Sequence, residues 1–226
     1  MAGWPPFERD GMGRVTLSFD NGPHEEVTSR VLDVLARHGV KATFFVLGEK
    51  LRNSTLYRQA ERAHAAGHWI GNHSMTHTIP LGEDRRPDAP ALEIGATQDL
   101  IGALAHPDKF FRPFGGGGHL DRRLLSRAAR DYLTRAQFTC VLWNVVPRDW
   151  EDPEAWVERA LEACSVEPET LIVLHDYVPA AMANLDRFVR GLKDGGHTIV
   201  QEFPASCVPI RRGAVAGDLT HLLADP

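Results

Sequence analysis

Short apolar runs and amphipathic stretches alternate along nearly the whole chain. The apolar runs are rich in β-branched and aromatic residues and predict strands at 15–19, 42–47, 69–72, 110–112, 138–143, 171–174 and 197–201. Between them, apolar residues recur three or four positions apart, which predicts helices at 25–38, 56–66, 91–104, 121–130, 153–163 and 182–194. Strands that are apolar throughout are typical of a parallel sheet covered on both faces.

The alternation predicts one α/β domain over residues 1–226. Seven strand–helix units follow one another without a long linker, which favours a single closed or nearly closed TIM-like barrel, (β/α)7. A doubly wound open sheet is the alternative. Residues 81–90 are charged and proline-rich and are predicted to form a surface loop, whereas 211–226 form a C-terminal tail that either packs on the barrel or is disordered. Asp121 is predicted to cap one helix, and Pro153 to lie in the first turn of another.

Composition agrees with a globular protein and narrows its partners. Of 226 residues, 43% are hydrophobic and 24% are charged, with a formal net charge of −5, so disorder is not expected. A chain without a basic face is a poor candidate for binding nucleic acid. No apolar run approaches the length of a membrane span, and residues 1–10 lack the pattern of a secretory signal. We therefore expect a cytoplasmic protein that does not bind membranes, and the sequence leaves its oligomeric state open.

The cysteines do not indicate a metal or disulfide framework. The chain has three, Cys140, Cys164 and Cys207, and no Cys-x-x-Cys motif. Cys140 lies inside an apolar run, so we expect it to pack in the core.

Polar side chains with catalytic potential follow the ends of five predicted strands. They are, in chain order, Asp20 and Asn21, His73 and His77, Arg112, Asp149 and Trp150, and His175 and Asp176. The carboxyl ends of the strands share one face of a parallel barrel, and active sites lie on that face. The positions therefore predict a candidate active site, although a buried structural role for His175 is an alternative.

The spacing of His73 and His77 is compatible with a metal site. On a helical turn, two imidazoles four positions apart point the same way and can share one metal ion. Two unconnected loop histidines are an equally good interpretation of the same residues.

Arg112 is followed by a proline, a phenylalanine and four glycines. The glycines permit close approach of the backbone to a ligand, or a flexible lid. No Lys-Ser or Lys-Thr follows at the offset of a P-loop, and no Gly-x-Ser-x-Gly elbow occurs, so neither a P-loop nor a serine hydrolase of that type is indicated.

Five motifs in this order resemble those of the polysaccharide deacetylase family, carbohydrate esterase family four. They are Ser-Phe-Asp-Asn-Gly-Pro at 18–23, His-Ser-Met-Thr-His at 73–77, Arg-Pro-Phe-Gly at 112–115, the run at 143–150 that ends in Asp-Trp, and Leu-Ile-Val-Leu-His at 171–175. The similarity spans about 15–201. It implies a distorted barrel of seven strands and a metal-dependent hydrolase that removes N- or O-acyl groups from sugars.

The resemblance also implies roles for individual residues. Asp20 is expected to be the general base and Arg112 the group that orients it. His175 is expected to be the general acid, with Asp149 as its tuning partner.

The implied cofactor is a divalent metal ion, most simply Zn²⁺, with His73 and His77 as ligands. The implied substrate contacts are Trp150, Phe114, Gly115 and His119, of which His119 is equally well interpreted as a solvent-exposed loop residue.

Three positions depart from the family pattern. Asn21 stands where the family has its metal-binding aspartate, and a neutral amide oxygen is a weaker ligand than a carboxylate. Asp20 is a possible substitute ligand, at the expense of its role as base. Val146 replaces the usual aspartate before a proline, and the glycines and histidine at 116–119 replace bulkier residues.

The expected activity is hydrolysis of a carbon–nitrogen bond that is not a peptide bond, with N-deacetylation of an acetylated amino sugar or oligosaccharide as the leading substrate class. A hydrolase of a small linear or cyclic amide or ureide, similar to allantoinase, is the first alternative. A metal-poor carbohydrate-binding relative without catalysis is the second, because Asn21 replaces an acidic ligand. A purely structural subunit has no support in the sequence.

Overall fold

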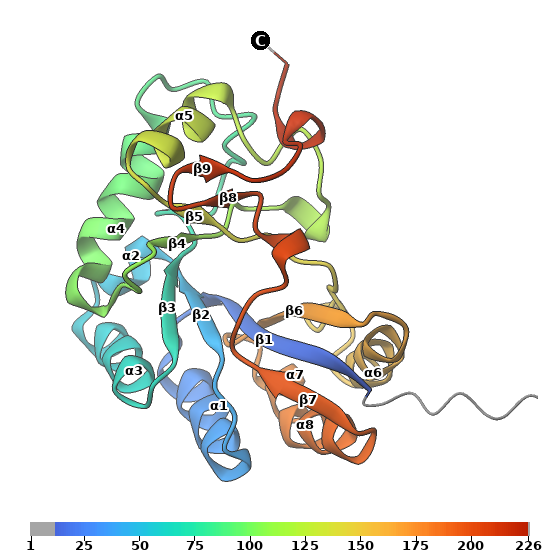
Figure 1. Cartoon of the computed structure of the whole chain (residues 1–226). Coiled ribbons are helices and arrows are strands. Elements are labelled where there is room, and N and C mark those ends of the chain that lie inside the picture. Colours follow the sequence, from blue (N-terminus) through green and yellow to red (C-terminus); the bar gives the residue numbers. More distant parts are fainter. Residues whose placement is uncertain (1–11, 226) are drawn as a thin grey trace, which may run out of the picture.

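A nine-stranded sheet organises the fold in the computed structural model, which describes residues 12–225 (Figure 1). Its strands are β1 (Met12–Gly22), β2 (Thr43–Val46), β3 (Trp69–Asn72), β4 (Phe110–Phe111), β5 (Thr139–Cys140), β6 (Glu169–His175), β7 (His197–Val200), β8 (Ile210–Arg211) and β9 (Ala214–Val215). The order is β6-β1-β2-β3-β4-β5-β8-β9, with β7 also paired to β1. The pairings among β1 to β7 are all parallel, as the apolar runs predict.

The sheet curls into a distorted barrel. An isolated parallel bridge between Val145 and Ile172 connects the segment after β5 to β6, opposite the long β1–β6 pairing. The expected α/β barrel of seven parallel strands in a single domain is therefore confirmed, with the closure reduced to this one bridge.

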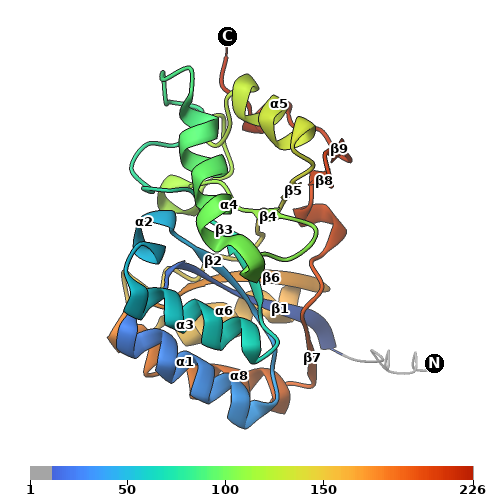
Figure 2. The same cartoon turned by 90° about the vertical axis from the view of Figure 1, so that its left-hand side faces the viewer.

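Helices cover the outside of the curled sheet (Figures 1 and 2). They are α1 (Glu25–His38), α2 (Gly48–Leu51), α3 (Ser54–Ala65), α4 (Ala96–Ile101), α5 (Arg127–Arg135), α6 (Trp156–Val166), α7 (Pro179–Met182) and α8 (Leu185–Asp194), with a π-helical turn η1 (Ala91–Gly95) before α4. Helices α3, α1, α8 and α6 contact one another in that order. Their apolar faces bury side chains such as Val31, Leu35 and Phe188 against the strands.

Helix α1 has the bounds predicted from its periodicity, and Gly39 ends it in the left-handed conformation with φ 65°. Two predicted helix starts are wrong. Helix α5 is capped by Ser126, whose Oγ accepts the N–H of Ala129, while Asp121 accepts the N–H of Arg123 in a separate turn. Pro153 precedes α6 and is not in its first turn, because the Asp152 side chain accepts two amides of a non-helical turn there.

Other elements also differ from their predicted extent. The predicted helix 91–104 is divided into π, α and 3₁₀ segments, and 182–194 is interrupted at Ala183 and Asn184 between α7 and α8. The Asn184 side chain donates to the carbonyl of Pro153, which fixes the chain at this break. Residues 81–88 contain turns and irregular backbone, in agreement with the predicted loop.

The C-terminal segment packs on the barrel. The antiparallel pair β8–β9 extends the sheet beyond β5, and Leu219 and Leu222 are buried in the core that includes α5. Of the two alternatives for 211–226, packing is therefore correct for the described residues up to 225.

All three cysteines are buried and unpaired, and Cys140 lies in the core as expected. Between residues 12 and 225, no helix combines the length and apolar character needed to cross a membrane. The prediction about residues 1–10 lies outside the described part of the chain.

Candidate active site

One pocket collects residues at the carboxyl ends of the strands, where Asp20, Asn21 and His175 still belong to β1 and β6 instead of following them. It is lined by Asp20, Asn21, His73, His77, Pro113, Phe114, Gly115, Gly117, Gly118, Trp143, Val146, Trp150, Val173, His175 and Tyr177. Of the predicted strand-end side chains, all line the pocket except Arg112, Asp149 and Asp176, which are buried. His119, a predicted substrate contact, is exposed and does not line it. Asp176 is buried behind His175 and accepts a hydrogen bond from Thr28.

Asp20 and His175 are direct partners in the parallel ladder of β1 and β6, which places both side chains at the mouth of the barrel. The Arg112 guanidinium lies under Asp20. Its Nη1 donates to Asp20 Oδ1 at 2.8 Å and to Ser18 Oγ at 2.7 Å. Its other nitrogens donate to two backbone carbonyls after β5, so the buried cation has partners on every side.

The charges around Asp20 favour its ionised form. Burial raises the pKa of Asp20, but the Arg112 guanidinium and the imidazoles of His73 and His175 outweigh burial, so the net pKa lies below its ordinary value. The carboxylate is thus an anion with one oxygen fixed by Arg112. Such a group is able to accept a proton in the pocket.

The surroundings of His175 shift its pKa in the opposite direction to that of Asp20. Its Nδ1 lies 2.7 Å from Asp149 Oδ1, and its backbone N–H donates to Asp149 Oδ2 at 2.9 Å. Burial lowers the pKa of His175, but the hydrogen bond and charge of Asp149, aided by Asp20 and Asp176, raise it overall. The Asp149 contact fixes the ring with Nδ1 as donor and leaves Nε2 for the pocket.

His73 and His77 are brought together on an irregular loop and not on the expected helical turn. Their ring centroids are 4.9 Å apart. The His73 Nδ1–H donates to the carbonyl of Arg112 at 2.9 Å, which leaves Nε2 as the acceptor. Burial lowers the pKa of His73, and burial together with the neighbouring His73 imidazole lowers the pKa of His77 to about 3. Both imidazoles are therefore neutral, the form that binds metals.

Asn21 supplies an oxygen that has no partner. Its Oδ1 is buried and accepts no hydrogen bond from the described residues, and its backbone has a positive φ of 66°. A buried polar atom without a partner costs free energy unless a ligand or water satisfies it. The Asn21 carbonyl, by contrast, accepts a hydrogen bond from Lys50 at 2.6 Å, which fixes the turn.

The donor set fits a divalent metal ion only if Asn21 takes part. Across residues 12–225, no group of three or more His, Cys, Asp or Glu is arranged to hold a metal. Two neutral imidazoles and the unsatisfied amide oxygen give three protein donors, the number found at catalytic zinc sites with an open position. Asp20 is a poorer third donor because Arg112 already binds its Oδ1, although Oδ2 lies 3.5 Å from His73 Nε2.

The glycine run forms a wall of the pocket. A Cβ on Gly115 would lie 2.6 Å from the Trp143 ring, so only glycine fits against that ring. Trp143 Nε1 donates to the Gly118 carbonyl at 3.0 Å, which fixes the loop. Val146 contributes an apolar side chain to this wall.

Sequence reasoning missed Tyr177 as a pocket residue. Its ring lies 5.8 Å from that of His175 in an edge-on arrangement, and Trp150 flanks His175 on another side at 4.8 Å. An aromatic residue two positions after a strand-end histidine was the available signal. The two rings give the pocket flat apolar surfaces beside the candidate acid.

An anionic carboxylate and a raised-pKa imidazole that face one pocket define a hydrolase site of the acid–base type, beside two neutral imidazoles able to bind a metal. Comparison with known proteins identifies the family. Residues 8–137 match the family model for polysaccharide deacetylase. The chain belongs to the polysaccharide deacetylase family, and its homologues named deacetylases support hydrolysis of a carbon–nitrogen bond that is not a peptide bond.

Individual relatives agree with this assignment. A chitooligosaccharide deacetylase of Rhizobium leguminosarum bv. phaseoli is 37% identical over 179 residues, which cover 75% of this chain and 72% of that protein. Among solved structures, T48 deacetylase with substrate has a TM-score of 0.68 at 30% identity, covering 84% of this chain and 88% of that one. A family 4 carbohydrate esterase from Streptomyces lividans in complex with acetate has a TM-score of 0.71 at 26% identity, covering 92% and 100%.

Proposed function

We propose that this chain removes the N-acetyl group from an acetylated amino sugar within an oligosaccharide of the chitooligosaccharide class, with a divalent metal ion held by His73, His77 and Asn21. The observation that carries the proposal is the cross-strand pair of Asp20 and His175. These two residues have pKa values shifted in opposite directions at the mouth of one pocket. Pairs of this kind are the usual basis for assigning a base and an acid.

The chemistry assigned to the residues is hydrolysis of an acetamide. Asp20 accepts a proton from the water that attacks the carbonyl carbon, and Arg112 keeps the carboxylate in place. The carbon–nitrogen bond then breaks, and His175 Nε2 gives its proton to the departing amine. The products are acetate and the free amino sugar. A bound divalent metal supplies Lewis acidity, which polarises the acyl oxygen and makes water more acidic.

The shape of the pocket supports a single sugar unit as the group that enters. Its volume is about 210 Å³, below the roughly 300–1,000 Å³ of pockets that enclose drug-sized ligands. Trp150 and Tyr177 offer aromatic faces to a sugar ring. The rest of an oligosaccharide would then extend outside the pocket.

The test is acetate release from N-acetylchitooligosaccharides by protein purified without chelator and supplied with Zn²⁺. Turnover is expected for the natural chain, with one free amine formed for each acetate. Asp20→Asn is expected to abolish turnover while circular dichroism stays unchanged. Absence of acetate from the metal-loaded natural chain, or full activity of Asp20→Asn, contradicts the proposal.

A second candidate function rests on Asn21. If the neutral amide fails to hold a metal, the same pocket becomes a carbohydrate-binding site without turnover. That outcome predicts calorimetric binding of the oligosaccharide together with no bound metal and no acetate. The small amide or ureide alternative instead predicts hydrolytic ring opening of a cyclic ureide, with one new carboxylate for each ring opened, and none of these results with sugars.

A further inference from the structure

The loop that carries His73 and His77 contains no helix or strand. Ser74 and His77 adopt positive φ angles of 69° and 53°, which are costly for residues other than glycine. The carbonyls of Ser74 and Met75 accept N–H groups from the start of α2, both at 3.0 Å. Since the loop has little internal hydrogen bonding, its shape depends on groups outside it.

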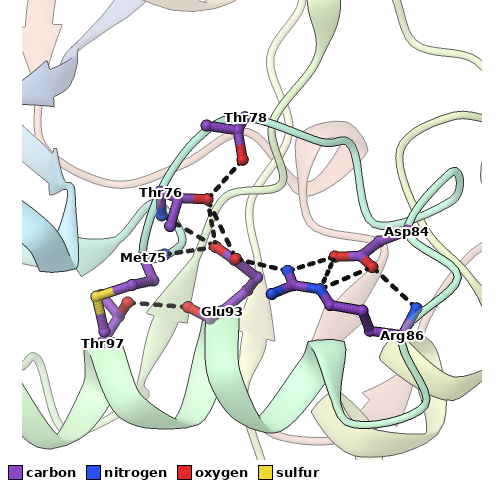
Figure 3. Close-up of polar contacts among 7 residues, drawn as sticks. All are labelled: Met75, Thr76, Thr78, Asp84, Arg86, Glu93 and Thr97. Atoms are coloured by element: carbon purple, nitrogen blue, oxygen red, sulfur yellow. Dashed lines mark hydrogen bonds and ion pairs between the residues drawn. The ribbon is translucent and has the colours of Figure 1, made fainter.

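The opposite side of the loop is held by the carboxylate of Glu93. Glu93 Oε2 accepts the backbone N–H groups of Met75 and Thr76, each at 3.0 Å, and Thr76 Oγ1 donates to Glu93 Oε1 at 3.1 Å (Figure 3). The Glu93 residue is only 4% exposed. One buried carboxylate therefore binds two consecutive amides directly before His77.

Glu93 is itself fixed by Arg86 and Asp84. Arg86 Nη2 donates to Glu93 Oε1 at 2.9 Å, and Asp84 binds the same guanidinium through both of its oxygens (Figure 3). A buried carboxylate needs such a cationic partner, because an unpaired charge would be expensive to remove from water. The three side chains form a chain of contacts from the surface loop to the histidine loop.

The backbone around Glu93 has an unusual form. Glu93 lies in the π-helical turn η1, and π turns occur mainly as local widenings of α-helices, often at functional sites. The same turn accepts a hydrogen bond from Asn72, the last residue of β3, through the carbonyl of Ile94 at 2.9 Å. The turn therefore contacts both the strand before the histidine loop and the loop itself.

We infer that Glu93 is a positioning residue for the two histidines: its carboxylate fixes the Met75 and Thr76 amides and so holds His77 against His73 in the arrangement needed for a shared metal ion. The inference rests on the proposed metal site. Glu93 does not reach the pocket, so it acts through the loop and not on the substrate. Partners that orient metal ligands typically contribute 10- to 100-fold to metal affinity.

The test compares two substitutions of Glu93. Glu93→Met keeps the length of the side chain and removes the acceptor, whereas Glu93→Gln keeps one acceptor oxygen. Co²⁺ titration followed by visible absorption reports both affinity and coordination. Glu93→Met is expected to weaken Co²⁺ binding about 10- to 100-fold, and Glu93→Gln by less than about tenfold.

Ser126→Ala serves as the control for stability, because it removes the cap of helix α5, and Ser126 makes no hydrogen bond to Glu93 or to the histidine loop. It is expected to lower the unfolding temperature and leave Co²⁺ affinity unchanged. The inference is overturned if Glu93→Met binds Co²⁺ as the natural chain does. It is also overturned if Glu93→Gln loses as much affinity as Glu93→Met, or if affinity simply follows unfolding temperature in all variants.

A separate measurement tests the role of Glu93 even if the proposed metal site is wrong. If the natural chain binds no Co²⁺, the proposed metal site fails, and the imidazole signals of His73 and His77 in nuclear magnetic resonance spectra decide about Glu93. Signals displaced in Glu93→Met, but unchanged in Glu93→Gln and Ser126→Ala, support the positioning role. Unchanged signals in Glu93→Met overturn it.

Discussion

At the level of single residues, the adjacent side chains of Asp20 and Asn21 are suited to different roles. The Asp20 carboxylate is bound by Arg112 and ionised, whereas the Asn21 amide oxygen is buried without a partner. Neighbours in the sequence thus have different surroundings, because one side chain points at a buried cation and the other does not.

Asn21→Asp is predicted to strengthen Zn²⁺ binding by about tenfold or more, which corresponds to about 1.4 kcal/mol, because a carboxylate adds a charge that the amide lacks. Competition with a chromophoric chelator measures the change. Asn53→Asp is the matched control: it adds the same charge at the cap of α3, where aspartate also caps well. Equal affinities for Asn21→Asp and the natural chain would argue against Asn21 as a ligand.

The acid–base assignment predicts a bell-shaped pH profile. Activity is expected to fall at acid pH as Asp20 is protonated through its lowered pKa, and at alkaline pH as His175 loses its proton through its raised pKa. Asp149→Asn removes the group that raises the pKa of His175, so this pKa should fall. Titration of His175 by nuclear magnetic resonance in metal-free protein measures it, with Asp152→Asn as a charge-matched control.

At the level of elements, the predicted strand ends located most of the pocket residues, whereas the predicted limits of several helices were wrong. Parallel strands place their carboxyl ends on one face whatever their exact length, which is why Asp20, His73 and His175 meet although they lie at the ends of strands of 11, 4 and 7 residues. Helix starts depend on which of several polar side chains binds the first amides. Ser126, rather than Asp121, occupies that position for α5.

Gly115→Ala is predicted to displace Trp143, because the new Cβ would lie 2.6 Å from its ring. The Trp143–Gly118 hydrogen bond should break, with a loss of about 1–3 kcal/mol in stability from overpacking and a higher KM. Gly116→Ala is the matched control, since its Cβ would approach only Arg123, at 3.8 Å. Denaturant unfolding and tryptophan fluorescence measure both variants, and equal behaviour would contradict the role given to Gly115.

At the level of the whole molecule, Arg112 joins parts of the chain that are far apart in sequence. From the end of β4 it reaches Ser18 and Asp20 on β1 and the carbonyls of Val141 and Leu142 after β5. The Phe45 ring on β2 lies 4.0 Å from the guanidinium carbon. One buried cation therefore stabilises the curled sheet and the active-site carboxylate together.

Arg112→Met is predicted to lower the free energy of unfolding by roughly 3–5 kcal/mol at neutral pH, because Asp20 is left buried without its partner. The loss should shrink toward acid pH: the lowered pKa of Asp20 stabilises the folded state at neutral pH, and this contribution disappears as Asp20 is protonated. Denaturant unfolding at several pH values measures it. The double variant Asp20→Asn/Arg112→Met should lose less than the two single losses combined, and strict additivity would contradict the pairing.

The sequence by itself determined the alternation of strands and helices, the parallel barrel and the edge where the reactive residues gather, because side-chain periodicity and strand polarity are local properties. Only the tertiary structure decided how those residues act. The family resemblance implied that Arg112 orients Asp20, but only the fold gives the hydrogen bond between them. The unsatisfied Asn21 oxygen, the support of the His73–His77 loop by Glu93 and the packing of the C-terminal segment likewise depend on contacts between segments far apart in the sequence. Such contacts form only when distant segments fold together, and no local pattern encodes them.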